Sequence, residues 1–186
     1  MTVVIGDDGL ARCPWGVSTP DYVAYHDDEW GRPVRGDRLL YERLTLEAFQ
    51  SGLSWITILR KREGFRAAFA NFDPAVVADF GDDDVARLMA DVSIVRNRAK
   101  IEAAINNARA ALTVDLSELL WSFAPAPRAR PTDRASVPAL TDESKAMAKA
   151  LKKHGFKFVG PTTAYALMQA CGLVDDHIEG CCVPAA

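Results

Sequence analysis

The chain has 186 residues, of which 49% are hydrophobic and 25% are charged, and its formal net charge is −3. This composition excludes a disordered or fibrous chain, and the length fits one globular domain. The negative total excludes a uniformly basic coat for phosphates, but it is compatible with a nucleic-acid enzyme whose basic residues are confined to one face.

The N-terminal sequence MTVVIGDDGLAR has acidic residues where a secretory signal would have its apolar stretch. No apolar run reaches the roughly 20 residues that are needed to cross a bilayer. We therefore expect a cytoplasmic protein that makes no membrane contact. Residues 1–12 are expected to form a flexible N-terminal extension, and residues 13–186 a single domain.

The region from Asp37 to about Gly52 predicts a helix. Asp37 can cap its start, and Leu40, Leu44 and Glu47 follow at i, i+4 and i+7 on one face. A carboxylate therefore lies on an apolar stripe. The residue pattern alone leaves open whether that carboxylate turns to solvent.

Further helices are indicated downstream, and the period-2 alternation of strands is not sustained anywhere. Asp73 precedes a proline and can cap a helix. Another helix is expected from Asp82, with helical spacing kept by Val85, Leu88, Met89 and Val92. The segment 94–112 predicts a long amphipathic helix with Arg and Lys on its polar side. Residues 124–138 hold four prolines and predict an irregular connection.

The segment GFKFVG, at 155–160, is a glycine-flanked hairpin between two predicted helices. The first helix follows Thr141 and stops at Gly155, and the second begins at Pro161. Free backbone N–H groups at a helix start attract anions, and Lys157 adds positive charge, so this unit can bind a phosphate. An ordinary turn packed in the core is the alternative. The lysines that gather here are Lys145, Lys149, Lys152, Lys153 and Lys157.

Two cysteines and two histidines near opposite ends of the chain form a candidate metal site: Cys13 and His26, and His177 and Cys181. This donor set suits tetrahedral Zn²⁺, and the i, i+4 spacing of the second pair can place both residues on adjacent helical turns. Four protein ligands leave no open position, so such a zinc would be structural. Hydrogen-bonded histidines and core cysteines are the alternative. Two cysteines are interpreted as non-ligands, Cys171 in the core and Cys182 beside the cluster.

Four long motifs occur in a fixed order: CPWG at 13–16, YVAYHDDEWGRP at 22–33, LTLEAFQSGLSWITILRKRE at 44–63, and LKKHGFKFVGPTTAYALMQACGLVDDH at 151–177. Over 13–182 the chain resembles the bacterial 3-methyladenine DNA glycosylase I family. The resemblance implies an all-α, helix-hairpin-helix glycosylase fold. It also implies one structural zinc ion per chain, which ties the N- and C-terminal regions together through Cys13, His26, His177 and Cys181.

The activity implied by the resemblance is hydrolysis of the N-glycosidic bond of 3-methyladenine after the nucleotide is flipped from the duplex, leaving an abasic site. By the same resemblance Glu47 and Tyr25 hold the base, and Trp55 stacks on it. Further aromatic residues near the pocket are Tyr22, Trp15 and Trp30. Since adenine methylated at N3 is cationic, aromatic faces and a carboxylate favour it over neutral adenine. Core packing is the alternative role for the aromatic residues.

The loop QSGLSW leaves the Glu47 helix through a glycine and places Leu53 at a turn, where an apolar wedge could fill the gap left by a flipped nucleotide. Leu53 could equally anchor the loop to the core. The expected DNA-binding residues are Gly52, Leu53, Ser54, Lys157 and Gly160.

Asp175 and Asp176 lie where many members of the wider superfamily have a catalytic aspartate. The resemblance does not assign them that role, and Asp176 could instead orient the neighbouring zinc ligand His177.

The partner implied is alkylated double-stranded DNA, with no obligate protein partner and a monomeric chain. Two rival functions remain at this level. One is a non-enzymatic, zinc-stabilised helix-hairpin-helix DNA-binding module, and the other is an interaction protein that never contacts DNA.

Overall fold

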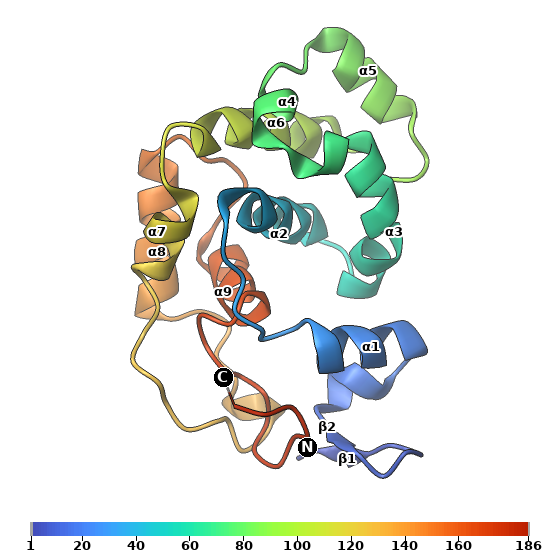
Figure 1. Cartoon of the computed structure of the whole chain (residues 1–186), viewed down its shortest axis with the longest axis vertical. Helices are drawn as coiled ribbons and strands as arrows, with labels where there is room; N and C mark the ends of the chain where they lie inside the picture. Colours follow the sequence, from blue (N-terminus) through green and yellow to red (C-terminus); the bar gives the residue numbers. More distant parts are fainter. Residues whose placement is uncertain (1, 186) are drawn as a thin grey trace.

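The computed structural model describes residues 2–185 and is predominantly helical (Figure 1). Within that range no helix is long and apolar enough to cross a membrane. The α-helices are α1 (Pro20–Asp28), α2 (Asp37–Gln50), α3 (Trp55–Ala68), α4 (Pro74–Ala78), α5 (Asp82–Ala90), α6 (Arg98–Ala111), α7 (Leu116–Trp121), α8 (Asp142–Lys153) and α9 (Pro161–Ala170). Three short 3-10 helices accompany them, η1 (Pro14–Val17), η2 (Ala70–Phe72) and η3 (Arg134–Ser136). The expectation of an all-α chain is confirmed in its main feature.

Helix α2 is the centre of the core. It contacts α3, α6, α7 and α9, which surround it in Figure 1. Leu40, Leu44 and Phe49 are fully buried against these neighbours, and each such side chain contributes about 1.5–3 kcal/mol of burial free energy. Because α2 is enclosed on most sides, three of its polar residues are buried as well, Glu42, Thr45 and Glu47.

The start of α2 differs from the prediction in its cap. Gly36 occupies the capping position, and Asp37 is the first helical residue. The Asp37 carboxylate instead accepts a hydrogen bond of 3.0 Å from the backbone N–H of Ser117, at the start of α7. The sequence did not indicate α7, which is only six residues long.

The long helix predicted over 94–112 begins later, at Arg98, because the side chain of Asn97 caps it by accepting from the backbone N–H of Lys100. Ile94 is buried but precedes the helix. The helix predicted from Asp82 is present as α5, but Val92 lies beyond its end and is 71% exposed, so the prediction that Val92 continues the apolar face is wrong.

Lys100 was expected on the polar side of its helix, but it is buried. Its Nζ donates to the backbone oxygens of Phe49 at 2.9 Å and Ser51 at 2.5 Å. These carbonyls end α2 and have no partner inside the helix, so the ammonium group satisfies them and complements the helix dipole. The loop that follows α2 is thereby held against α6.

The two predicted helices around GFKFVG are present as α8 and α9. Thr141 and Ser144 form a reciprocal capping box at the start of α8, and Gly155 ends that helix with a φ of +86°, which a glycine adopts without strain. The side chain of Asn107 on α6 then bonds both backbone groups of Lys157, at 2.7 Å to its N–H and 2.9 Å to its oxygen. The hairpin is therefore fixed to the body of the protein.

Residues 2–12 form a short hairpin where we expected a flexible extension. β1 (Val4–Ile5) pairs antiparallel with β2 (Ala11–Arg12). The buried Arg12 side chain bonds the carboxylates of Asp27 at 2.7 Å and Asp8 at 2.6 Å. The backbone N–H of Cys182 donates to the oxygen of Ala11. The N-terminal hairpin and the segment around Cys182 consequently lie side by side.

Candidate active site and metal-binding cluster

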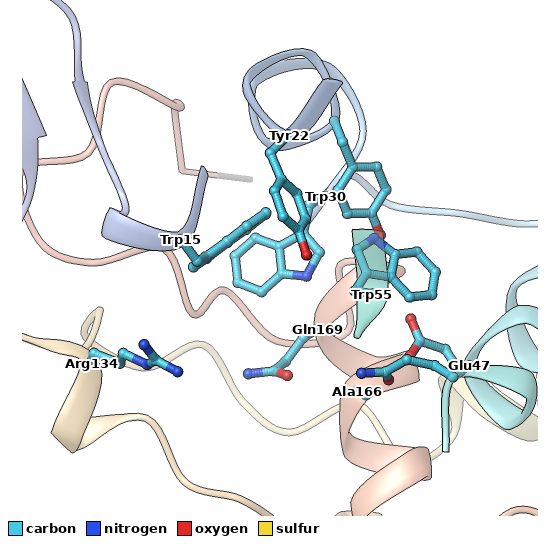
Figure 2. Close-up of a pocket in the computed structure, with 10 residues that line it drawn as sticks. Trp15, Tyr22, Trp30, Glu47, Trp55, Arg134, Ala166 and Gln169 are labelled. Carbon is cyan, nitrogen blue, oxygen red and sulfur yellow. The ribbon is translucent and has the colours of Figure 1, made fainter. Parts of the chain in front are cut away.

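A cavity of about 380 Å³ opens beside α2 and α9 (Figure 2). Its volume falls within the roughly 300–1,000 Å³ that is usual for small-molecule pockets. The residues lining it are Trp15, Tyr22, Tyr25, Trp30, Glu47, Gln50, Trp55, Arg134, Ala166 and Gln169. All six residues that the sequence assigned to base binding and catalysis are in this set, so the tertiary structure brings together residues from η1, α1, α2 and α3.

Glu47 points its carboxyl group into this cavity, and its side chain does not turn to bulk solvent (Figure 2). The residue is only 5% exposed. Burial raises the pKa of the Glu47 carboxyl to about 8, while the nearby Arg43 lowers it. No group among residues 2–185 donates a hydrogen bond to it. A buried carboxyl with a perturbed pKa and a free face is typical of a functional group rather than a structural one.

Tyr25 and Trp55 cover the same end of the cavity. Their ring centroids lie 5.5 Å apart at an interplanar angle of 40°. Burial raises the pKa of Tyr25 well above its ordinary value, with a smaller contribution from Glu47, so its hydroxyl stays neutral and can orient a ligand. The indole Nε1 of Trp55 is buried and has no hydrogen-bond partner in the described part of the chain.

Trp15 and Trp30 form a second aromatic wall. Their ring centroids are 5.0 Å apart in an edge-to-face arrangement, and Tyr22 packs on Trp15 at 5.7 Å. The same two indoles contact the histidines of the candidate metal cluster, Trp15 on His26 at 5.2 Å and Trp30 on His177 at 4.8 Å. Trp15 and Trp30 therefore line the cavity with one side and pack on the histidines of the cluster with the other.

Sequence analysis missed four residues that line the cavity: Gln50, Arg134, Ala166 and Gln169. Gln50 could have been found, because it lies one helical turn after Glu47 on the same helix. Gln169 and Ala166 lie on α9, which we assigned only to phosphate binding. Arg134 comes from the irregular connection 124–138, where no periodicity indicates which side chain faces inward.

Asp176 does not orient a metal ligand, and that suggestion is wrong. Its fully buried side chain pairs with Arg128 at 2.8 Å and accepts from the hydroxyl of Tyr165 and from Nε2 of Gln169. A carboxylate only accepts, so the Gln169 amide must present its NH₂ group to Asp176, and its oxygen is left for the cavity. Asp176 therefore fixes Gln169. The neighbouring Asp175 pairs with Arg130.

Cys13, His26, His177 and Cys181 converge so that their ligand atoms all lie within 4.8 Å of one another, an arrangement able to bind a metal ion. The Sγ atoms of Cys13 and Cys181 lie 3.7 and 3.6 Å from Nδ1 of His177. Nε2 of His26 lies 3.5 Å from Sγ of Cys181. Residues 177–181 are not helical, so the predicted helical turns are wrong, but the loop brings both side chains to the same point.

The ring nitrogens that face away from the cluster have their own partners. Nδ1 of His26 lies 2.7 Å from the Asp27 carboxylate, and Nε2 of His177 lies 3.1 Å from the backbone oxygen of Trp30. Such outer contacts fix the orientation of ligating histidines. Gly16 is required for close approach, because a Cβ there would lie 2.7 Å from the His26 ring. As expected, Cys171 is a buried core residue, and Cys182 is outside the cluster.

The residues expected to bind DNA lie at two places outside the cavity. Gly52 has a φ of +80° and forms the turn between α2 and α3. Leu53 follows it and is 40% exposed, and Ser54 occupies the position before the first residue of α3. Lys157 and Gly160 line a separate groove of about 980 Å³ beside the hairpin. Other lysines on this groove are Lys145, Lys149 and Lys152.

Comparison with known proteins places this sequence and fold among glycosylases. The family model described as methyladenine glycosylase matches residues 15–184. DNA-3-methyladenine glycosylase 1 of Escherichia coli is 48% identical over 180 residues, which cover 93% of this chain and 96% of that protein.

Solved structures agree with the sequence comparison. A crystal structure of 3-methyladenine DNA glycosylase I superposes with a TM-score of 0.89 at 49% identity, covering 93% of this chain and all (100%) of that one. A variant of 3-methyladenine DNA glycosylase I, solved in complex with 3-methyladenine, superposes with a TM-score of 0.87 at 35% identity, covering 92% and 96% of the two chains. On the match of nearly its whole length, this chain belongs to the methyladenine glycosylase family.

Proposed function

We propose that this protein is a base-excision repair enzyme that hydrolyses the N-glycosidic bond of 3-methyladenine in alkylated double-stranded DNA and leaves an abasic site. The observation that carries the proposal is the buried Glu47 carboxyl, which faces an aromatic cavity and has no hydrogen-bond partner in the described part of the chain. Relatives that carry this activity in their names, one of them solved with 3-methyladenine bound, support it.

The chemistry of Glu47 explains selectivity for a cationic base. In the empty cavity its pKa of about 8 keeps the carboxyl largely neutral at neutral pH. A base that arrives positively charged lowers that pKa and favours the carboxylate, which then forms a charge-assisted contact in a site shielded from water. Neutral adenine provides no such gain. Trp55 adds stacking on the cation, and the neutral Tyr25 hydroxyl orients it.

The leaving group of this reaction is already activated, because methylation at N3 makes the adenine cationic. The protein's residues therefore bind and orient the base and exclude water from around it. They do not need to act as strong acids. The base must leave the duplex to reach Glu47, so the reaction requires a flipped nucleotide and an element that fills the gap.

Glu47→Gln should slow release of free 3-methyladenine from methylated DNA by at least roughly 30-fold, because an amide cannot supply the negative charge that faces the cationic base. Single-turnover release, followed by chromatography of the freed base, measures the effect. The matched control is Glu42→Gln, because Glu42 is buried on the same helix but pairs with Arg66 outside the cavity. A folded Glu47→Gln protein with the wild-type rate would remove the role of Glu47. DNA binding by the wild type without base release would instead identify a non-enzymatic module.

The pKa of Glu47 also predicts how stability depends on pH. Folding raises that pKa from 4.5 to about 8, so the folded state holds the proton more tightly. The contribution of protonated Glu47 to the free energy of unfolding is fully present below about pH 4.5 and is lost as the pH rises to about 8. The free energy of unfolding of the wild type, relative to Glu47→Gln, should fall by on the order of 2–4 kcal/mol between pH 5 and pH 8. Urea unfolding of both proteins measures it, and a difference that is constant with pH would contradict the burial.

We propose that Leu53 is the wedge that fills the duplex when the nucleotide leaves. It is exposed at a tight turn, and Lys100 holds the end of the preceding helix, so the turn is fixed in place. Gly52 and Ser54 flank the wedge, and Lys157 and Gly160 are proposed to contact the phosphate backbone at the second site.

Leu53→Ala should weaken binding to duplex DNA that contains an abasic-site analogue by about tenfold, because the apolar filler is lost. Leu39→Ala is the matched control, because Leu39 is also exposed but lies near the opposite end of α2. Fluorescence anisotropy gives both affinities. Equal affinity of Leu53→Ala and wild type would assign Leu53 to loop packing only.

We propose that the cluster of Cys13, His26, His177 and Cys181 holds one structural zinc ion. Tetrahedral zinc with ordinary Zn–S and Zn–N bonds separates a sulfur and a nitrogen ligand by roughly 3.6 Å. The observed separations of 3.5, 3.6 and 3.7 Å fit that value. The donor set satisfies the ion with four protein ligands, so its role would be to join the chain ends.

Cys13→Ser should reduce the zinc content from one ion per chain to near zero and lower the free energy of unfolding by roughly 4 kcal/mol or more. Cys182→Ser is the matched control, since this neighbouring cysteine is outside the cluster. Atomic emission spectrometry and urea unfolding measure the two quantities. Wild-type protein that contains no zinc, or a Cys182→Ser variant that loses it equally, would contradict the assignment.

A further inference from the structure

Arg134 is a cation that faces the cavity from the side opposite Glu47 (Figure 2). It lies on η3 and lines both the main cavity and an adjoining one of about 270 Å³. It forms no ion pair and donates no side-chain hydrogen bond within residues 2–185. Its charge is therefore available to a ligand.

The two acids next to Arg134 in the turn and in the adjoining cavity, Asp133 and Asp176, form no ion pair with it. The carboxylate of Asp133 caps η3 by accepting from the backbone N–H of Ser136 at 2.9 Å and from its hydroxyl at 2.7 Å. Asp176, which lines the adjoining cavity, is paired with Arg128. The turn thus holds a guanidinium group at the rim of the cavity that is not engaged in an ion pair with either acid.

Between the Glu47 carboxyl and the Arg134 guanidinium group lies a neutral amide. The amide of Gln169, fixed by Asp176, stands between Glu47 and Arg134 in Figure 2. The cavity therefore presents a carboxyl group, an amide and a guanidinium group in that order. An N3-alkylated nucleotide has the complementary order, a cationic base, a neutral sugar and an anionic phosphate.

We propose that Arg134 binds a phosphate that flanks the flipped nucleotide, so that the site reads a cationic base and an adjacent anion together. This inference rests on the proposed function, because it takes the flipped nucleotide as the ligand. A guanidinium group cannot serve the cationic base, since like charges repel. It matches a phosphate well, because its planar fork can donate two parallel hydrogen bonds.

The test is a double-mutant cycle that combines substitution of Arg134 with neutralisation of single phosphates in the DNA. Duplexes carry a tetrahydrofuran abasic-site analogue, with either the 5′ or the 3′ flanking phosphate replaced by a neutral methylphosphonate. On the unmodified duplex, Arg134→Ala should bind about tenfold more weakly than wild type, and Arg134→Lys should lose less. The slope of log K against log salt should become less steep by about 0.9 for Arg134→Ala, as expected for one lost phosphate contact.

With the methylphosphonate at one of the two positions, the affinity of the wild type for the duplex should fall by the same factor of about ten. The affinity of Arg134→Ala should not fall any further. Arg87→Ala is the matched control, because Arg87 lies on α5, away from the cavity (Figure 1). The proposal would be overturned if Arg134→Ala bound the unmodified duplex as tightly as the wild type does. It would also be overturned if Arg134→Ala bound more weakly than the wild type on both methylphosphonate duplexes. An equal loss in binding free 3-methyladenine would also overturn it, since that would show that Arg134 shapes the base site.

This assay separates the two proposals, because the abasic duplex has no base to excise. A wild-type protein that releases no 3-methyladenine from methylated DNA refutes the proposed function. A wild-type protein that releases it, combined with an Arg134→Ala variant that binds DNA normally, refutes only the phosphate contact.

Discussion

Side chains from opposite ends of the chain converge at Cys13, His26, His177 and Cys181, and the arrangement of the cavity depends on this convergence. His26 and His177 are covered by Trp15 and Trp30, which also line the cavity. Because closely packed interiors transmit displacement, a change in the cluster would move the aromatic wall. A change in the N-terminal hairpin would also reach the aromatic wall, because Arg12 of the hairpin bonds Asp27, and Asp27 bonds His26 of the cluster.

The second constraint is the position of α2 at the centre of the core. A helix enclosed on most sides buries some of its polar residues, and Glu47 is buried without a pairing cation because its carboxyl opens on a cavity. The cost of that burial appears as a raised pKa, and a cationic ligand offsets it. Glu47 thus lowers the free energy of unfolding at high pH when no base is bound, and it favours an alkylated base over a normal one. The stability and the selectivity of the site have one physical origin.

Around this site, the polar groups are held by partners away from the cavity. Asp176 holds Gln169, Asp27 and the Trp30 carbonyl hold the histidines, and Lys100 holds the end of α2. Such supports leave the inward faces of the side chains free while fixing their orientation. In this arrangement the Glu47 carboxyl and the Arg134 guanidinium group, at opposite ends of the cavity, can meet a ligand without first breaking internal contacts.

By itself, the sequence determined the helical class, the positions of α2, α8 and α9, and the residue types for a metal cluster, because periodicity, caps and donor chemistry are local properties. The resemblance to a family then selected Glu47, Tyr25 and Trp55 among several candidates. Only the tertiary structure decided that Glu47 faces a cavity, that Asp176 supports Gln169, and that Arg134 lies opposite Glu47. These facts depend on contacts between segments far apart in the chain, and an irregular connection such as 124–138 has no periodicity from which the direction of a side chain could be inferred.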